Sequence, residues 1–402
     1  MFFITAFTIW FLIHFYLGLR IIPPLELKKP MRWLLWAAAL TLFLLVPITA
    51  SLRTIYPAPF YYNFLFWTSF IAAGYTLIAF PLMAAKDLAC LLSKSFLALK
   101  SRLINQGAHP PRDPGRRYFL SNALNLGVIG VSGVLSGVAM NNARALPAVK
   151  KVDVPITGLK ESLDGFRIAH ITDTHISQSI HRSFMQGVVD AVNGLEPDLV
   201  SFTGDMVDGA PQEMARDIAP LAGLKAKHGV FFVTGNHEYY WNLDGWLKES
   251  KKNGMTVLIN EHKVISHNGS RVMVAGVTDY SAGRHVPSHR SDPDKAVSGA
   301  GGASGAPDCD FRIMLAHQPR SAPGVSRAGA DLQLSGHTHG GQFFPWNLVV
   351  NLFHPVAPGL HRYNGMWVYV SRGSGYWGPP YRLAAPSEIT LLTLRATARQ
   401  TA

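Results

Sequence analysis

Long apolar stretches in the N-terminal third constrain this chain more than any other feature. Three of them span residues 1–22, 31–52 and 62–85, each close to the ~20 residues that a helix needs to cross a bilayer core. A fourth, residues 118–143, has no charged side chain but contains four glycines. We therefore predict an N-terminal α-helical membrane region of about four spans, in residues 1–145. A buried core helix is the alternative for each stretch, and more readily for the fourth.

The positive charge of the chain is confined to this N-terminal part. Residues 1–150 carry fourteen Lys and Arg against three acidic residues, whereas residues 151–402 carry 23 basic and 22 acidic residues. The C-terminal part therefore has almost no excess of positive charge with which to bind nucleic acid. Nucleic acid is not expected as a partner. An apolar fraction of 48% excludes a disordered chain, and two cysteines exclude a disulfide scaffold.

The distribution of basic residues also predicts an orientation. Four lie between the first two stretches and seven between the last two, but the loop between the second and third stretches has only Arg53. Loops rich in Lys and Arg stay in the cytoplasm, so the chain beyond residue 143 is expected outside. The prediction is a multi-pass protein of a bacterial cytoplasmic membrane with its C-terminal domain on the extracytoplasmic side.

The fourth stretch has a second interpretation. Arg116 and Arg117 precede it and Ala145 follows it, so that residues 116–145 resemble a twin-arginine export signal. An ordinary basic flank of an ordinary span explains the pattern equally well, and cleavage after Ala145 stays open. Residues 146–165 are polar, with two prolines, and are predicted as a linker or a first strand before a domain at 166–402.

From residue 166 onward, short runs of β-branched and aromatic residues alternate with amphipathic stretches. This order favours a layered α/β domain. Residues 297–306, rich in Gly, Ala and Ser, have the composition of a flexible insertion. Strands are predicted at 166–172, 198–204, 229–235, 271–277, 311–317, 331–336, 366–371 and 388–394, and helices near 184–195, 212–225 and 244–253.

Residues with metal-binding side chains follow five of these strands. Each fragment alone is typical of a cap or a turn. Five of them at strand ends point to one site, because carboxylates and imidazoles are the ligands that two divalent cations need. In chain order they are Asp-x-His at 173–175, GDxxD at 204–208, GNHE at 235–238, the single His317 and GHTH at 336–339.

This series of motifs resembles the calcineurin-like metallophosphoesterase superfamily over about residues 163–395. The ending YVSRGSGYWGPPYRLAAPSEITLLTL looks like the membrane-associated bacterial branch, often with a twin-arginine signal. The resemblance implies a sandwich of two mixed sheets flanked by helices. It also implies that Asp173, His175 and His339 bind one cation, that Asn236, His317 and His337 bind another, and that Asp205 bridges the two.

The resemblance implies a mechanism as well. An Asn ligand and the lack of cysteine point to two ions of Mn, Fe or Zn. A metal-bridging hydroxide would attack a phosphomonoester, phosphodiester or pyrophosphate. His237 would assist the leaving group, and Asp208 would orient His237, with a helix cap as the alternative for Asp208.

Aromatic residues gather after GNHE, after GHTH and in the GYWGPP segment. These residues either form a rim around the site that receives a lipid-linked substrate at the membrane, or they pack in the core of the domain. Core packing is the more common role of large aromatic residues. The predicted function is a membrane-anchored, dinuclear metal-dependent phosphoesterase acting on a phosphate ester. The alternative is a non-catalytic membrane sensor or assembly factor that uses the domain as a metal-stabilised binding module. The sequence does not identify substrate-binding residues.

Overall fold

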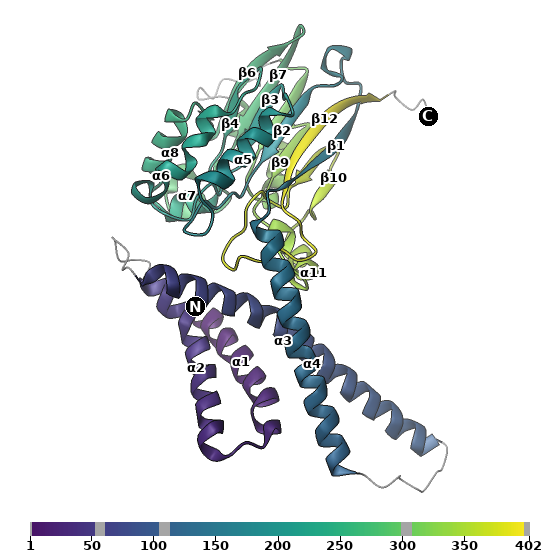
Figure 1. Cartoon of the computed structure of the whole chain (residues 1–402). Coiled ribbons are helices and arrows are strands. Elements are labelled where there is room, and N and C mark those ends of the chain that lie inside the picture. Colours follow the sequence, from purple (N-terminus) through teal and green to yellow (C-terminus); the bar gives the residue numbers. More distant parts are fainter. Residues whose placement is uncertain (1, 53–60, 104–112, 299–307, 398–402) are drawn as a thin grey trace. The chain divides into compact units, whose positions relative to one another are not determined.

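The computed structural model describes residues 2–52, 61–103, 113–298 and 308–397 (Figure 1). The chain divides into two compact units. One unit comprises Met1–Met140 with Gly378–Pro380, and the other comprises Asn141–Trp377 with Tyr381–Ala402.

The first unit is built from long apolar helices, as predicted. Four helices in the described part of the chain are long and apolar enough to cross a membrane. Most of their large apolar side chains are not covered by other parts of the protein, which is expected where lipid is the solvent. The helices are α1 (Phe2–Ile21), α2 (Lys29–Leu52), α3 (Tyr62–Leu103) and α4 (Pro114–Arg144).

Helix α3 runs well past the predicted end of its span at residue 85. The added segment, 86–103, is rich in Leu, Ala and Lys and contains neither Gly nor Pro, so nothing in it ends a helix. Helix α4 begins at Pro114, a residue favoured in the first turn because its missing N–H would be unpaired there in any case.

A polar cluster joins the helices of the first unit. The Asp87 carboxylate of α3 accepts a hydrogen bond from the Tyr16 hydroxyl (2.6 Å) and pairs with Arg20 (2.6 Å) and Lys86 (2.9 Å). Lys86 also donates to Asn125 of α4 at 2.6 Å. An acidic group near lipid is tolerated only when it is paired, so this cluster fixes α1, α3 and α4 at one common level.

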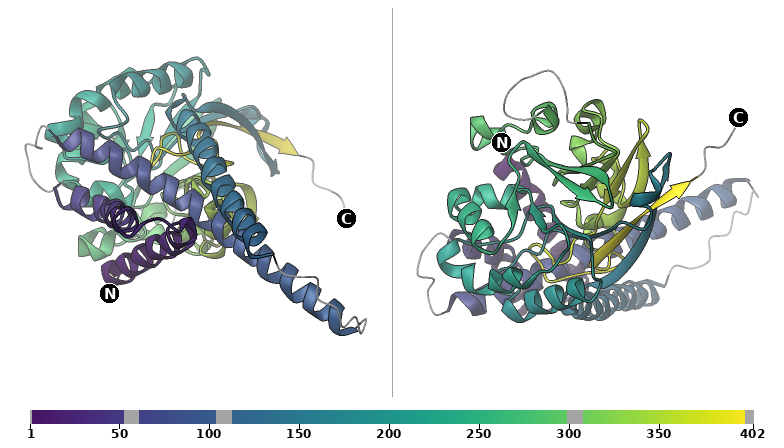
Figure 2. Two further views of the ribbon diagram at one scale, coloured as in Figure 1. Left: turned by 60° about the horizontal axis from the view of Figure 1, so that its bottom comes forward. Right: turned by 90° about the horizontal axis from the view of Figure 1, so that it is seen from above.

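The second unit contains two six-stranded mixed sheets (Figure 2). In the first, β2 to β5 are parallel; in the second, β7, β8, β9 and β11 are parallel. The first sheet has the order β1 (Ala148–Thr157), β12 (Glu388–Thr397), β2 (Arg167–Ile171), β3 (Leu199–Phe202), β4 (Val230–Phe232), β5 (Thr256–Val257). The second has the order β10 (Gly359–Tyr363), β11 (Met366–Val370), β9 (Leu332–Ser335), β8 (Phe311–Leu315), β7 (Ser270–Gly276), β6 (Glu261–His267).

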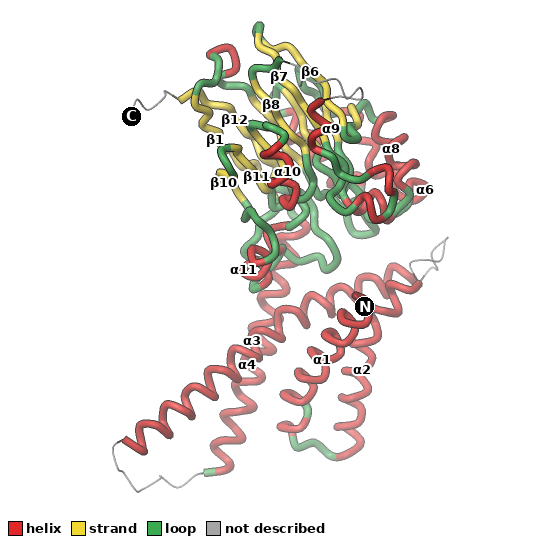
Figure 3. Tube along the Cα trace, turned by 180° about the vertical axis from the view of Figure 1, so that it is seen from behind, coloured by secondary structure: helices red, strands yellow, loops and turns green. Residues whose placement is uncertain are grey.

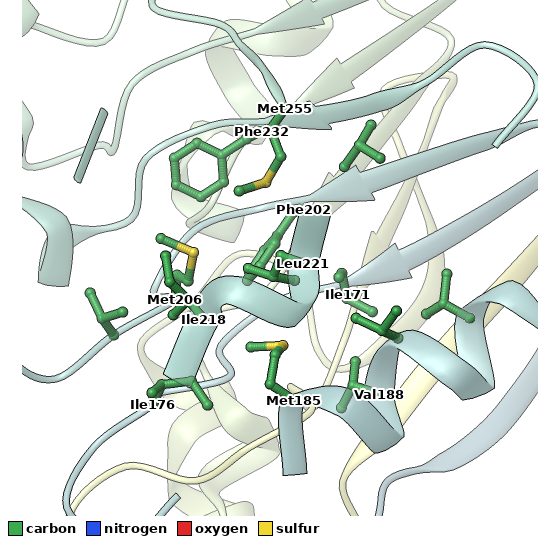
Figure 4. Packing of buried hydrophobic residues seen from close by; sticks show 14 of the residues in the cluster. Ile171, Ile176, Met185, Val188, Phe202, Met206, Ile218, Leu221, Phe232 and Met255 are labelled. Atoms are coloured by element: carbon green, nitrogen blue, oxygen red, sulfur yellow. The ribbon is translucent and has the colours of Figure 1, made fainter. Parts of the chain in front are cut away.

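Three apolar clusters hold these layers together. One lies between the sheets and includes Ile168 and Ile313. Another joins the first sheet to α5, α6 and α8, with Met185 packed near Phe202 (Figure 4). The third joins the second sheet to α9 and α10, which lie over β7, β8 and β11 in Figure 3. The predicted sandwich flanked by helices is confirmed. Its helices are α5 (Arg182–Asn193), α6 (Pro211–Ile218), α7 (Asn236–Tyr240), α8 (Leu243–Lys252), α9 (Pro293–Ser298), α10 (Ala322–Arg327) and α11 (Trp346–Val349).

All eight predicted strands are present, and the four further strands are the edges of the two sheets. The segment 146–165 is not a free linker, because β1 within it pairs in parallel with β12 over its whole length. An edge strand has a neighbour on one side only and carries more polar residues, so its apolar signal is weak. The predicted insertion at 297–306 falls mainly on residues outside the described part of the chain.

Candidate metal centre

The five motifs meet at one end of the sandwich. Strands β2, β3 and β4 are parallel neighbours in one sheet, and β8 and β9 are parallel neighbours in the other. Parallel strands present their carboxyl ends at the same edge, so the loops that follow them converge. The segments that follow these strands, including the first turn of α7, carry all of the predicted site residues: Asp173, His175, Asp205, Asp208, Asn236, His237, His317, His337 and His339.

Asp173, His175 and His339 form one group of possible ligands, with one atom from each lying within 4.8 Å of the others. His175 Nε2 lies 3.1 Å from His339 Nε2, and Asp173 Oδ1 lies 3.6 Å from the same His339 nitrogen. All three residues are buried. Imidazole nitrogens and a carboxylate that face one point are the donor set of a metal site.

Asp205, His317 and His337 form a second group. Asp205 Oδ2 lies 3.2 Å from His317 Nε2, which lies 3.2 Å from His337 Nδ1. Asn236 is buried, and its Oδ1 has no hydrogen-bond partner within the described ranges. A buried amide oxygen without a partner is costly, and a cation would satisfy it.

One carboxylate oxygen faces both groups. Asp205 Oδ2, close to His317, also lies 3.8 Å from His175 Nε2 of the first group. Two neighbouring cations repel each other, and a shared carboxylate offsets that repulsion. The residues therefore fit a pair of divalent ions that share Asp205.

The backbone of these loops is unusual. Asp173, His175, Asp205, His337 and His339 all have positive φ, between +45° and +68°. This left-handed region is costly for residues with a Cβ and persists only where the surrounding structure imposes it. Such strain is concentrated at functional sites, and here it falls on five of the seven predicted ligands.

Close approach between the loops explains the glycines of the motifs. A Cβ at Gly204 would collide with the backbone of Gly235, and one at Gly235 would collide with Asp205. A Cβ at Gly336 would likewise collide with Asp173. The GD, GN and GH dipeptides thus allow side chains from separate loops to reach one another.

Asp208 binds two imidazoles. Its Oδ1 lies 2.5 Å from His237 Nδ1, as predicted, and also 3.1 Å from His175 Nδ1. Both rings are thereby turned so that their Nε2 atoms face Asp205. The alternative of a helix cap does not fit, since α6 has Ala210 at its N-cap.

The charge of His237 follows from its neighbours. Burial disfavours the charged ring, but the carboxylates of Asp205 and Asp208 outweigh burial and raise the pKa of His237 to about 9. These two carboxylates favour the protonated form of the His237 ring. His339 has the opposite setting, because burial and the Arg382 guanidinium hold its pKa well below the usual value.

Two residues of the site received no role from sequence reasoning. Glu238, the last residue of GNHE, is buried and accepts hydrogen bonds from the N–H groups of Asp205 (3.1 Å), Met206 (2.8 Å) and Gly235 (2.7 Å). Burial and the Asp205 carboxylate raise the pKa of Glu238 to about 7. Glu238 therefore links the segment that carries Asp205 to the segment that carries Gly235. In the sequence, only its position in the GNHE motif pointed to such a role.

Arg382 is the second. Its buried guanidinium donates to the carbonyls of Gly375 (3.1 Å), His339 (3.1 Å) and Ala385 (3.2 Å), and Nη2 lies 2.9 Å from His339 Nδ1. The guanidinium lies against the Nδ1 edge of the His339 ring, and the Nε2 atom of that ring faces the first group. No local pattern marks Arg382, because its contact with the proposed ligand His339 joins residues 43 positions apart.

The aromatic residues near the site divide between core and surface. Phe343 is buried, which agrees with core packing, but Tyr240 and Trp377 are 53% and 56% exposed. Their rings lie 5.2 Å and 6.0 Å from the His237 ring. The alternative prediction of core packing is therefore wrong for Tyr240 and Trp377, which are exposed and border the site.

Comparison with known proteins agrees with this geometry. A family model for calcineurin-like phosphoesterases matches residues 166–341. The chain is also 34% identical over 290 residues to a metallophosphoesterase of Campylobacter jejuni, an alignment that covers 71% of this chain and 73% of that protein. The chain belongs to the calcineurin-like phosphoesterase family. Its membership accounts for the two sheets and for the ligand-bearing loops at their carboxyl ends.

Other relatives of this chain come from animals. It is 37% identical over 295 residues to a bovine "transmembrane protein with metallophosphoesterase domain", covering 71% of this chain and 64% of that one. A zebrafish protein of the same description is 35% identical over 273 residues, covering 66% and 61%. The chain thus spans under two thirds of these relatives. The predicted resemblance to a bacterial branch in particular is not supported, since these relatives are animal proteins. The four long apolar helices agree with the prediction of a membrane protein.

Proposed function

We propose that this protein is a membrane-anchored phosphoesterase that uses two divalent metal ions to hydrolyse phosphate esters. The observation that carries the proposal is the position of Asp205 Oδ2, 3.2 Å from a nitrogen of one ligand group and 3.8 Å from a nitrogen of the other. The buried Asn236 oxygen, which has no hydrogen-bond partner within the described ranges, supports it because a cation would satisfy that oxygen.

Each cation is assigned its own set of ligands. Asp173, His175 and His339 would hold the first ion, and Asp205 would be shared by both ions. When bound, the two ions would acidify a water molecule and neutralise charge on the phosphoryl oxygens. Harder oxygen and nitrogen donors favour Mn, Fe or Zn. The second ion is held by Asn236, His317 and His337.

His237 and Asp208 carry out the proton chemistry. A water molecule gives up one proton to solvent, its oxygen adds to phosphorus and the ester P–O bond breaks. The departing oxygen takes the proton from His237 Nε2, and solvent then returns a proton to His237. The Asp208 carboxylate accepts a hydrogen bond from His237 Nδ1 at 2.5 Å, which keeps Nε2 directed at the site. Asp208 is therefore a positioning residue for both His237 and His175.

The membrane part of the proposal concerns orientation. The catalytic unit lies on the extracytoplasmic side of a cytoplasmic membrane, opposite the loops rich in Lys and Arg. Arg20 and Lys86, which flank different spans, pair with the same Asp87, and this supports a common cytoplasmic level for both. We infer that helix α4 is retained as a span; the burial of Ala143, in its last turn, in the core of the catalytic unit supports this.

The substrate class is a phosphomonoester, a phosphodiester or a pyrophosphate, with lipid headgroups among the candidates. A sensor or assembly factor with a metal-stabilised binding module is the competing function. The buried pair of His237 and Asp208 favours an enzyme, because a binding module has no use for a proton donor held beside its metals.

Hydrolysis of bis(p-nitrophenyl) phosphate by the full chain in detergent with Mn²⁺ tests the proposal. Asp205→Asn is expected to abolish turnover together with binding of at least one ion. His237→Ala is expected to lower kcat about 10²–10⁴-fold while metal content is unchanged. His361→Ala, an exposed histidine in β10, is the matched control and should retain full activity.

Two results would overturn the proposal. Turnover that is absent with each of Mn²⁺, Fe²⁺ and Zn²⁺, although two ions are bound per chain, would favour the binding module. Equal activity of the His237→Ala and His361→Ala variants would remove His237 from the reaction.

A further inference from the structure

The loop after the GHTH motif has an unusual composition. Residues 341–361 contain no Lys, Arg, Asp or Glu and read GQFFPWNLVVNLFHPVAPGLH. The segment includes α11 and a short 3₁₀ turn, Val350–Leu352. A surface loop of a water-soluble enzyme is normally polar, so a charge-free stretch of this length beside the candidate site needs an explanation.

Several side chains of this loop are exposed rather than packed. Phe344, Leu348, Leu352 and Phe353 are 41%, 62%, 79% and 63% exposed, respectively. Together with Tyr240 and Trp377 they form what we call the apolar collar. Soluble proteins rarely expose apolar groups in a continuous set, and where they do the set marks a binding surface.

The collar is attached to the candidate metal centre. Gln342 donates to the Trp377 carbonyl at 2.9 Å and accepts from the Trp377 N–H at 2.9 Å, which fixes the loop beside that ring. Trp377 and Tyr240 in turn lie next to His237. One end of the loop is therefore held beside Trp377, whose ring borders the proposed proton donor His237.

The last residues of α4 belong to the catalytic unit and contact the same end of the domain. Helix α4 has no charged side chain between Tyr118 and Arg144, and β1 starts at Ala148, at most about 14 Å of chain later. Within the catalytic unit, the Asn142 amide donates to the Arg382 carbonyl at 3.3 Å. The Arg382 guanidinium donates to the His339 carbonyl, so one arginine separates the end of an apolar helix from a proposed ligand.

We propose that the apolar collar inserts into the headgroup region of the leaflet from which α4 emerges, and that the substrate is a phosphate ester of a membrane lipid. Aromatic and uncharged apolar side chains prefer this region of a bilayer. The acyl chains remain in the membrane while the headgroup phosphate passes between Tyr240 and Trp377 to reach His237. The choice of substrate rests on the proposed phosphoesterase function; insertion of the collar does not.

Insertion is tested without any measurement of activity. A bimane label is placed by Leu352→Cys in the full chain carrying Cys90→Ser and Cys309→Ser, which is then reconstituted into phospholipid nanodiscs that contain doxyl-labelled lipid. Lys252→Cys, at the exposed end of α8, provides the control. The label from Leu352→Cys is expected to be quenched several-fold more strongly, and equal quenching of the two labels would overturn insertion.

The substrate class is tested with two esters that share a leaving group. One is soluble bis(p-nitrophenyl) phosphate, and the other is phosphatidyl-p-nitrophenol embedded in the nanodisc. In the variant Leu348→Ser, Leu352→Ser, Phe353→Ser, release of nitrophenol from the lipid is expected to fall at least tenfold. Its rate on the soluble ester should stay within twofold of wild type, because these three side chains lie outside the proposed path of the phosphate.

The outcomes separate this proposal from the function on which it rests. Equal loss on both esters would show that the loop only supports the fold, and no loss on either would show that the collar does not serve the substrate. Wild-type protein that cuts the soluble ester but not the lipid ester would overturn the lipid substrate and leave the phosphoesterase intact. Wild-type protein that cuts neither ester would overturn the phosphoesterase, while quenching would still decide insertion.

Discussion

At the scale of single residues, the site depends on side chains that bind other side chains. Asp208 accepts from His175 and His237, and Glu238 accepts from three backbone N–H groups on two loops. Such partners fix the tautomer and direction of a ligand, and their loss typically costs as much as the loss of a weak ligand. The identity of the ligands could be predicted from motifs, whereas these contacts required the fold.

Arg382→Met is expected to weaken metal binding about 10–100-fold, since His339 loses the group that orients it. It should also lower stability by about 1–3 kcal/mol for each buried carbonyl left without a donor. Metal titration followed by melting temperature measures both effects. Arg395→Met removes an exposed pair with Asp153 and should change the free energy of unfolding by less than about 1 kcal/mol. Similar losses in the two variants would contradict a specific role for Arg382.

His170 predicts a loss of stability in acid. It is buried in β2 with Nε2 2.9 Å from Thr203 Oγ1, and burial lowers its pKa to about 3. Below pH ~6.5, His170 binds a proton in the unfolded chain but stays neutral in the folded chain. The free energy of unfolding therefore falls by up to about 1.4 kcal/mol per pH unit as the pH decreases toward the pKa of the folded state.

The measurement is the melting temperature of the full chain in detergent and EDTA between pH 7.5 and 4.5. His170→Gln should make the acid loss shallower, whatever its effect at neutral pH. Parallel curves for this variant and the wild type would show that His170 does not contribute.

At the scale of elements, helix α4 belongs to both halves of the molecule. Most of its length is an apolar span, but Asn142 donates to Arg382 and Ala143 is buried against the core of the catalytic unit. Strand β1 follows after three residues and pairs with β12. A signal peptide that is removed has no reason to contribute to the core of the domain it exports.

The retained α4 predicts a chain that is not cut after Ala145. A protein with different tags at its two ends, expressed in a bacterium and detected through each tag, should run at one full-length mass. A shorter C-terminal product that begins near residue 146 would contradict this prediction and favour the export-signal interpretation of residues 116–145. An Arg116→Lys, Arg117→Lys variant shows separately whether export needs the arginine pair.

At the scale of the whole molecule, the orientation argument rests on charge alone. Extracytoplasmic placement predicts that alkaline phosphatase, which folds only outside the cytoplasm, is active when fused after Ala402. The same reporter inserted within residues 104–112, between α3 and α4, should be inactive. An inactive fusion after Ala402 together with an active insertion within residues 104–112 would contradict the predicted orientation and place the catalytic unit in the cytoplasm.

The sequence by itself determined the membrane helices, the central strands and the order of the motifs. These are local properties, because the length of an apolar run and the alternation of side chains along a strand are set by nearest neighbours. It did not reveal the edge strands β5, β6 and β10, whose polar residues carry little of that signal. Only the tertiary structure decided which groups meet: Asp208 with two imidazoles, Arg382 with His339, and an exposed Trp377 beside His237. Those contacts join residues up to 140 positions apart (His237 to Trp377). Strand order within the first sheet brings Asp208 to its two imidazoles, and the packing of the two sheets brings Trp377 to His237, so no local pattern could reveal them.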